Sequence, residues 1–324
     1  MKARYLKMIC VAGVIVFLLA GCGRKQEAVT TPPVTESEQA AETDAASEEA
    51  TRPPKGNKPE LVIALPKDIT GLNPMTSSGT INDNFLVLTH ETLFSKRDDG
   101  SVTPLLATEG VWVDDTTYEL MLRMDVTFSD GTKMTADDVV HTIKTARDLH
   151  HGAVAPLLTG ILETEAVAEN RVRFTCQEKI ADMEERLSSI ALSVQSKAAY
   201  ETGMQNPYLI GTGRYVFADR VNGRYTTFKL NDLYWGTAPG VSKRISFYAI
   251  PDEEARASAV LTGSVDVALL SGEDILTRFD NETSVLLYEP GFSEYRIVYR
   301  RATHIPVFYE NIPMPWGETY VILE

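Results

Sequence analysis

The sequence predicts a mixed α/β fold in which helices and strands follow one another without strict alternation. Three observations indicate it: the apolar run ELVIALP at 60–66, several hairpin signals between 111 and 230, and a helix-then-strand pattern at 252–270. The chain has 324 residues, of which 44% are hydrophobic. That length supports a sizeable core and about two domains.

The first 22 residues predict a lipoprotein signal peptide. Three basic residues among the first seven precede the apolar, uncharged stretch 8–21. That stretch is too short to cross a ~30 Å hydrocarbon core comfortably, so it indicates a signal-peptide core. Its end, LAGC at 19–22, resembles the bacterial lipobox, which implies that Cys22 is lipidated and anchors the protein to the cell membrane. The alternative is an ordinary signal peptide with an incidental cysteine.

Residues 23–59 predict a disordered acidic tether. They contain no aromatic residue and are rich in Thr, Pro, Glu, Ala and Ser. Such a segment cannot bury enough apolar surface to offset the entropy lost on ordering. We expect it to hold the folded part away from the membrane.

The ordered part begins with the buried strand predicted at 60–66, followed by the Gly/Pro/Ser loop 71–79. Apolar residues at helical spacing from Phe85 to Leu93 predict a helix capped by Asn82 or Asp83.

Three hairpins are then expected. Their turns lie at Asp114-Asp115-Thr116, at Glu169-Asn170 and at Asn222-Gly223, the last being the strongest signal. Residues 252–263 predict a helix ended by Gly263, followed by the strand VDVALL.

The stretch VTFSDGTKMTADDVVHTIKTA at 126–146 could be a metal or acid–base site, or the start of a helix. The helix interpretation is favoured. A short strand, VTF, leads to a turn at Asp130-Gly131, and Thr135 followed by Asp138 matches a capping box. His141 lies off the apolar face and is expected to be exposed to solvent. Metal binding would need further ligands converging on Asp137 and His141.

Charge, cysteines and motifs narrow the function classes. The formal net charge of −14 disfavours nucleic acid as a partner. Cys176 lies in the alternating run RVRFTC and is expected to be a buried structural thiol. The sequence contains no Gly-x-Ser-x-Gly elbow, no His-Glu-x-x-His and no phosphate loop, so we expect no enzyme, no catalytic residue, no cofactor and no metal site.

Six segments in order resemble family 5 of the extracytoplasmic solute-binding proteins, which serve ABC importers of peptides, dipeptides and nickel. They are LNP at 72–74, HETLFSKRDDGSVTPLLATEGVW at 90–112, ELMLRMDVTFSDGTKMTADDVVHTI at 119–143, IGTGRYVF at 210–217, NDLYWG at 231–236 and AVLTGSVDVA at 259–268. The family pattern usually has proline near Lys133 and at Arg214, where this chain departs from it.

The resemblance implies a periplasmic-binding-protein-like fold of type II, peptide-binding subclass, with two lobes that close over a ligand. The expected divisions are the first lobe at 60–92 and 189–300, an inserted mixed α+β subdomain at 93–188, and a closing strand and tail at 301–324. Most of the second lobe is missing from the sequence, which implies an internal deletion.

The resemblance further implies an oligopeptide- or dipeptide-binding lipoprotein that delivers its ligand to an ABC transporter permease outside the cytoplasm, with binding weakened by the missing lobe. The alternative is a surface lipoprotein that uses the remaining lobe for protein interaction or sensing. The candidate ligand contacts are small-residue loops and one aromatic pair. These are Ser77, Ser78, Gly79, Thr80, Gly211, Thr212, Gly213, Tyr234 and Trp235. A tight structural turn remains open for Gly211–Gly213, and a buried anchor for Tyr234 and Trp235.

Overall fold

The computed structural model describes residues 60–76, 85–97, 99–236, 242–279, 285–288 and 296–300, the last two ranges as backbone only. The predicted signal peptide, tether, Ser77–Thr80 loop and closing strand therefore lie outside the described residues. Across the described ranges, no helix has both the length and the apolar character needed to cross a bilayer.

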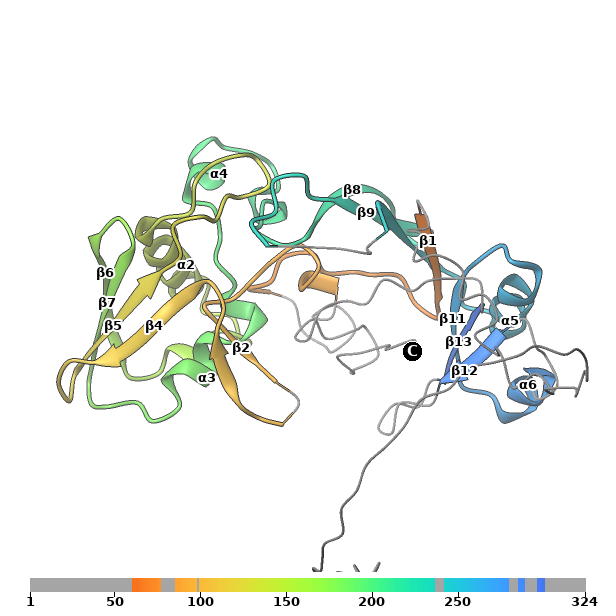
Figure 1. Cartoon of the computed structure of the whole chain (residues 1–324), viewed down its shortest axis with the longest axis horizontal. Coiled ribbons are helices and arrows are strands. Elements are labelled where there is room, and N and C mark those ends of the chain that lie inside the picture. The colour runs from red at the N-terminus through yellow and green to blue at the C-terminus, as the bar shows by residue number, and fades with distance from the viewer. Residues whose placement is uncertain are drawn as a thin grey trace, which may run out of the picture. The chain divides into compact units, whose positions relative to one another are not determined.

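A seven-stranded mixed sheet contains the first described strand at its centre (Figure 1). The strands are β1 (Glu60–Leu65), β8 (Tyr215–Val221), β9 (Tyr225–Leu230), β10 (Arg244–Ala249), β11 (Val267–Leu270), β12 (Val285–Tyr288) and β13 (Arg296–Arg300). Their order is β12-β13-β11-β1-β10-β9-β8. The central strand β1 pairs in parallel with both β10 and β11, while the outer pairs are antiparallel.

The core of this sheet is apolar on both faces of β1, as expected for a parallel central strand. Leu61, Ile63 and Leu65 pack in one cluster with Phe85, Phe228 and Phe247, among others. Ala64 packs in the other, beneath helix α5 (Glu253–Thr262). That helix ends at Gly263, whose φ of 78° is the left-handed conformation that favours glycine. The predicted strand, helix and glycine stop are confirmed.

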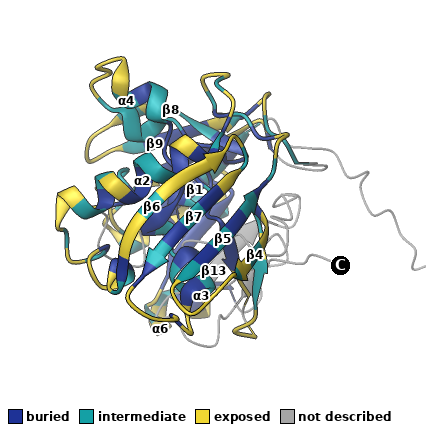
Figure 2. Ribbon diagram, turned by 90° about the vertical axis from the view of Figure 1, so that its left-hand side faces the viewer, coloured by how far each residue is buried: buried dark blue, intermediate teal, exposed yellow. Residues whose placement is uncertain are grey.

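A separate four-stranded antiparallel sheet is formed by residues 107–176. Its strands are β4 (Ala107–Trp112), β5 (Thr117–Leu122), β6 (Ile161–Ala168) and β7 (Arg171–Cys176), in the order β4-β5-β7-β6. Figure 2 shows β6 largely exposed, whereas β5 and β7 alternate mainly between buried and intermediate residues. The hairpins predicted at Asp114–Thr116, Glu169-Asn170 and Asn222-Gly223 are confirmed. Cys176 is a buried free thiol, and burial raises its pKa.

The remaining elements of the described ranges are short. They are β2 (Phe94–Lys96), β3 (Val102–Pro104), α3 (Met183–Leu187), α4 (Lys197–Glu201), α6 (Glu273–Leu276) and the 3₁₀ turns η1 (Pro156–Leu158), η2 (Ile190–Leu192), η3 (Pro207–Leu209) and η4 (Thr277–Phe279). The strands β2 and β3 form a two-stranded antiparallel ladder.

The predicted helix from Phe85 to Leu93 is wrong. Only residues 85–86 are helical, a turn follows at 87–89, and β2 begins at Phe94. The carbonyls of Leu88 and Thr89 accept hydrogen bonds from Tyr215 and Gly213 instead of from a continuing helix. The apolar spacing reflects burial of a turn, because long-range backbone contacts override local periodicity here.

Helix α2 (Ala136–Leu149) begins as the capping box predicts, and it packs against β6 and β7. The Thr135 backbone N–H donates to Asp138 Oδ2 at 2.8 Å, and the Lys197 N–H donates to Asp138 Oδ1 at 2.9 Å. Asp138 is buried, and burial raises its pKa against the lowering effect of these hydrogen bonds. This carboxylate therefore caps α2 and also fixes the start of α4.

Two smaller expectations in this region are wrong. His141 is only partly exposed, because its ring meets the edge of Tyr200 with centroids 4.8 Å apart. Residues 126–128 do not form a strand, since Thr127 makes only an isolated bridge to Lys133. The turn predicted at Asp130-Gly131 is present, with Gly131 at a φ of 88°.

We expect Asp138→Ala to lower the free energy of unfolding by about 1–3 kcal/mol, because it leaves the N–H groups of Thr135 and Lys197 without their acceptor. Thr135→Ala should cost about 0.5–2 kcal/mol as the loss of a cap. The matched control is Asp137→Ala, an exposed first-turn carboxylate expected to cost about 0.3–1 kcal/mol. Urea unfolding measures all three. Equal costs for Asp137→Ala and Asp138→Ala would contradict the bridging role.

Candidate functional site

Three parallel strands end at the same edge of the seven-stranded sheet, which we call the carboxyl edge. It comprises the ends of β1, β10 and β11 at Leu65, Ala249 and Leu270, with the loops that follow them. The Ile250 N–H donates to the Leu65 carbonyl at 2.9 Å, so two of these loops start in contact. In open α/β sheets, ligands bind outside the carboxyl ends of strands where connections diverge. This edge is therefore the candidate ligand surface.

The loop after β1 is held by apolar side chains that belong to two cores. Ile69 is buried in the core of the seven-stranded sheet, and Leu72 packs against that core. Met75 is fully buried in the core of the four-stranded sheet. Between them, Asn73 Oδ1 accepts the Met75 N–H at 3.1 Å and turns the chain. The described segment ends at Thr76, directly before the candidate residues Ser77–Thr80.

Asp68 connects this loop to the tip of the β8–β9 hairpin. Its Oδ2 accepts from the Gly223 backbone N–H at 2.8 Å and from Arg220 Nη2 at 3.2 Å. Gly223 has a φ of 73°, in the left-handed region that favours glycine. The hairpin tip therefore lies at the carboxyl edge.

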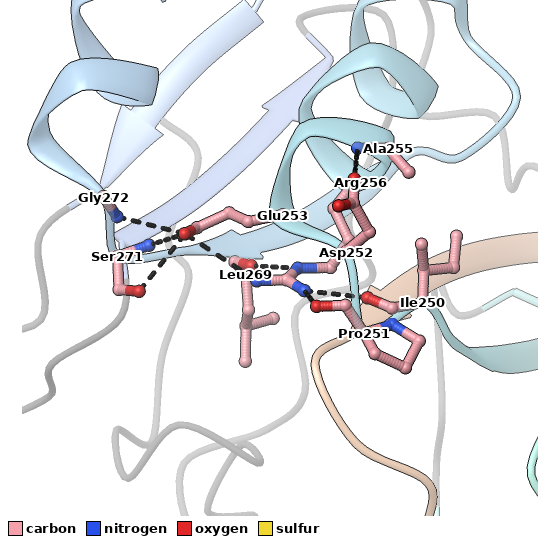
Figure 3. Close-up of polar contacts among 9 residues, drawn as sticks. All are labelled: Ile250, Pro251, Asp252, Glu253, Ala255, Arg256, Leu269, Ser271 and Gly272. Carbon is pink, nitrogen blue, oxygen red and sulfur yellow. Dashed lines mark hydrogen bonds and ion pairs between the residues drawn. The ribbon is translucent and has the colours of Figure 1, made fainter.

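A buried arginine fixes the loop after β10 against the end of β11 (Figure 3). Arg256 Nε donates to the Leu269 carbonyl at 2.8 Å, and its Nη1 donates to the carbonyls of Ile250 at 2.7 Å and Pro251 at 2.9 Å. Its side chain is only 3% exposed, so these bonds are shielded from water. Arg256 thereby joins two carbonyls that follow β10 to one carbonyl of β11.

Glu253 completes this arrangement from the same helix. Its Oε1 accepts from the Gly272 N–H at 3.0 Å and from both the N–H and the hydroxyl of Ser271 (Figure 3). Desolvation pulls the pKa of Glu253 upward, but these hydrogen bonds outweigh it and hold the pKa below its usual value. The first turn of α5 therefore positions two of the three loops of the carboxyl edge.

Three of the other five predicted site residues, Thr212, Tyr234 and Trp235, contact the carboxylate of Glu91, which the sequence analysis did not single out. Its Oε2 accepts from Trp235 Nε1 at 2.7 Å and Thr212 Oγ1 at 2.9 Å, and its Oε1 accepts from Tyr234 OH at 3.0 Å. Desolvation raises the pKa of Glu91, and the three hydrogen bonds oppose that rise.

Glu91, Thr212, Tyr234 and Trp235 form a group that we call the Glu91 cluster. Two arginines lie over its two aromatic rings. Arg123 lies 4.1 Å from the centroid of the Trp235 ring, and Arg214 lies 5.3 Å from that of Tyr234. Cation–π contacts of this length contribute about 0.5–2 kcal/mol each. The sequence shows these residue types but gives no signal that Glu91, more than 100 positions from Thr212, Tyr234 and Trp235, would contact them.

The glycines at 211 and 213 allow two backbones to approach closely. A Cβ on Gly211 would lie 2.0 Å from the Thr89 carbonyl oxygen, and one on Gly213 would lie 2.5 Å from the Thr89 carbonyl carbon. Gly213 also donates its N–H to the Thr89 carbonyl at 3.0 Å. These are contacts of the protein with itself, so a ligand contact by Gly211–Gly213 stays a prediction.

His90 lies beside these glycines and is buried. Its Nε2 lies 2.8 Å from the Tyr208 carbonyl, and its Nδ1 lies 2.8 Å from Thr89 Oγ1. The carbonyl can only accept, so Nε2 carries the proton of the neutral ring. Burial lowers the pKa of His90 to about 4, and the histidine is therefore neutral at physiological pH.

No three His, Cys, Asp or Glu side chains within the described ranges come close enough to hold a metal ion. Near α2, Asp137 Oδ2 lies 3.5 Å from Lys197 Nζ, and His141 faces Tyr200. The two potential ligands in the 126–146 stretch thus have protein partners.

A family model described as "Bacterial extracellular solute-binding proteins, family 5 Middle" matches residues 101–308. The chain is 30% identical over 230 residues to the nickel-binding periplasmic protein of Escherichia coli K12, covering 68% of this chain and 43% of that protein. It is 24% identical over 231 residues to the periplasmic murein peptide-binding protein MppA of the same organism, covering 65% and 43%.

Solved structures agree in fold. NikA from Brucella suis in complex with Fe(III)-EDTA superposes with a TM-score of 0.62 at 25% identity, covering 71% of this chain and 48% of that one. The oligopeptide-binding protein AppA from Bacillus subtilis, in complex with a nonapeptide, gives a TM-score of 0.61 at 19% identity, covering 71% and 47%.

The fold and the family match together define a solute-binding protein of the type II periplasmic class. The chain belongs to family 5 of the bacterial extracellular solute-binding proteins. It spans less than half the length of the curated relatives named above.

We expect Glu91→Ala to lower the free energy of unfolding by about 2–3 kcal/mol, because Thr212, Tyr234 and Trp235 would lose their shared acceptor. Urea unfolding followed by tryptophan fluorescence measures it. Glu163→Ala, an exposed carboxylate on β6, is the control and should change stability by less than about 0.5 kcal/mol. A cost below 1 kcal/mol for Glu91→Ala would rule out the central role of this carboxylate.

The neutral state of His90 predicts a pH dependence. Its folded pKa of about 4 lies below the usual value of 6.5, so the unfolded chain binds more protons between these values. Stability is therefore fully present above pH 6.5 and falls by about 3 kcal/mol as the pH drops to 4.

The measurement compares wild type with His90→Gln in urea at several pH values. The difference in stability between the two proteins should shrink from pH 6.5 to pH 4. A constant difference would show that His90 is not buried in its neutral form.

Proposed function

We propose that the protein is an extracytoplasmic binding protein that takes up a short peptide and delivers it to the permease of an ABC importer, without a catalytic step. The observation that carries this proposal is the carboxyl edge, where the loops after β1, β10 and β11 are held together by Asp68, Glu253 and Arg256. Family membership supports it, because the named relatives are binding proteins.

A peptide is favoured by the chemistry of the loop that follows Thr76. Ser77, Ser78, Gly79 and Thr80 offer backbone N–H and C=O groups with small side chains, which suit pairing with the main chain of an extended ligand. Relatives described as murein peptide-binding and glutathione-binding take peptide ligands, and another is described as nickel-binding. The peptide and the nickel complex are therefore the two ligands to compare.

The proposal includes the anchor and the divisions of the chain. Cys22 carries lipid, residues 23–59 form the tether, and 93–188 form the inserted subdomain between the two parts of the first lobe. The chain contributes one face of a ligand site, so binding is weaker than between two closing lobes, which bury most of a ligand's surface. A surface lipoprotein without transport is the alternative function.

Calorimetry with a mixed library of di- to pentapeptides tests the proposal. We expect a saturable heat with weak affinity, and its loss in Gly79→Trp, where an indole would fill the small-residue loop. The control is Gly152→Trp, because Gly152 is exposed and a Cβ there meets no atom within 4 Å.

Sub-micromolar affinity for a peptide would contradict the one-faced site. Equal heats in both tryptophan variants would place the peptide away from Ser77–Thr80. Heat from a nickel–histidine complex but none from peptides would overturn the peptide assignment, and no heat from either would favour the alternative.

A further inference from the structure

A cavity of about 540 Å³ lies outside the carboxyl edge, between the β4–β5 hairpin and residues 179–185. The two segments can be located in Figure 2 by β4, β5 and α3. The floor of the cavity is apolar: Ile180 and Met183 are buried, and Val102 packs against the same core. Neither the family resemblance nor the proposed function uses this cavity.

Two aromatic rings form one wall. The centroids of Trp112 and Tyr118 are 5.1 Å apart, with their planes inclined by 50°. The position of the Tyr118 ring depends on Gly110 in the neighbouring strand, because a Cβ there would lie 2.0 Å from the Tyr118 hydroxyl oxygen. Trp112 remains partly exposed, so its ring is accessible from the cavity.

A carboxylate lies at the end of this wall. The Tyr118 hydroxyl donates to Glu184 Oε1 at 3.0 Å, and Tyr118 itself is 1% exposed, so the bond orients Glu184 from a fixed group. Among the described residues, no lysine, arginine or histidine nitrogen lies within 4.0 Å of Glu184. The two neighbouring carboxylates differ, because Asp182 pairs with Arg186 at 3.0 Å and Glu185 pairs with Lys96 at 2.6 Å.

We propose that this cavity binds a primary ammonium group on an alkyl stem, the chemistry of a lysine side chain on a peptide or protein partner. The stem would lie on Val102, Ile180 and Met183, and the ammonium would donate to Glu184 beside the Trp112 ring. A charge-assisted hydrogen bond and a cation–π contact then act on the same group. Lys179 is the one basic residue among the lining side chains, against three carboxylates.

The charge of the whole chain favours the same class of ligand. Its formal net charge is −14, which raises the local concentration of cations near acidic cavities. Glu184 would repel an anionic ligand of equal size, and a neutral ligand would gain no charge–charge attraction from it.

The test is an NMR titration of the ¹⁵N-labelled protein with Nα-acetyl-lysine amide, with Nα,Nε-diacetyl-lysine amide as the neutral comparison. The chain has three tryptophans, and Trp112→Phe identifies the indole signal of Trp112. We expect the charged probe to shift that signal in a saturable manner and the neutral probe not to shift it. Glu184→Gln should weaken the charged probe roughly tenfold, the loss of one charge-assisted contact.

Glu163→Gln is the matched control, because it removes the same charge from an exposed position on β6 and should leave the affinity unchanged. The melting temperature of Glu184→Gln, compared with that of the control, shows whether the fold is retained. Equal shifts by the two probes, unchanged affinity in folded Glu184→Gln, or no saturable shift would each overturn the proposal. Because peptide binding at the carboxyl edge is measured separately with Gly79→Trp, the two proposals can fail independently.

Discussion

The parallel pairing of β1 with both β10 and β11 is the constraint on which the larger sheet depends. The strand order places β10-β9-β8 on one side of β1 and β11-β13-β12 on the other, so the two halves meet only through β1. The partner strands of β1 begin at Arg244 and Val267. The long segment between β1 and β10 must therefore close into a loop before β1 can pair with them. Closure entropy grows only slowly with loop length, which makes a long insertion between the partners tolerable.

The same pairing creates the candidate ligand surface. Because the three strands run in one direction, their loops emerge together, and each is then fixed by a buried or half-buried polar group. Arg256 and Glu253 belong to α5, the connection between β10 and β11, so the crossover helix also orders the loops at its own start. The Glu91 cluster adds a second fixed point, where a carboxylate satisfies three donors from segments far apart in sequence.

Local signals in the sequence predicted the two longest described helices and the strands of three hairpins. The Asn222-Gly223 turn, the Thr135–Asp138 capping box and the Gly263 stop each depend on a few neighbouring residues, and each is present in the structure. The expected helix at 85–93 failed because its carbonyls bond to residues 213 and 215. The expected exposure of His141 considers one helix alone, whereas Tyr200 from another helix packs against its ring.

The candidate site could be predicted only in part, because it too depends on contacts between residues far apart in sequence. Small residues and aromatic pairs can be recognised in a sequence, but the residue that they contact cannot. No local pattern predicts that Glu91 accepts hydrogen bonds from Thr212 and Trp235, or that Arg256 donates to three carbonyls. The resemblance identified the family correctly, because it rests on the order of segments and not on the partner of any one residue.

The bond between Asp68 and the Gly223 amide has a chemical consequence for the hairpin tip. Asn-Gly sequences convert to isoaspartate when the glycine nitrogen attacks the asparagine side chain, and here that nitrogen is already engaged in a turn of fixed conformation. The folded state thus protects Asn222 from conversion to isoaspartate, whereas each unfolding event allows that reaction. Isoaspartate accumulating at this position would record the time that the molecule has spent unfolded.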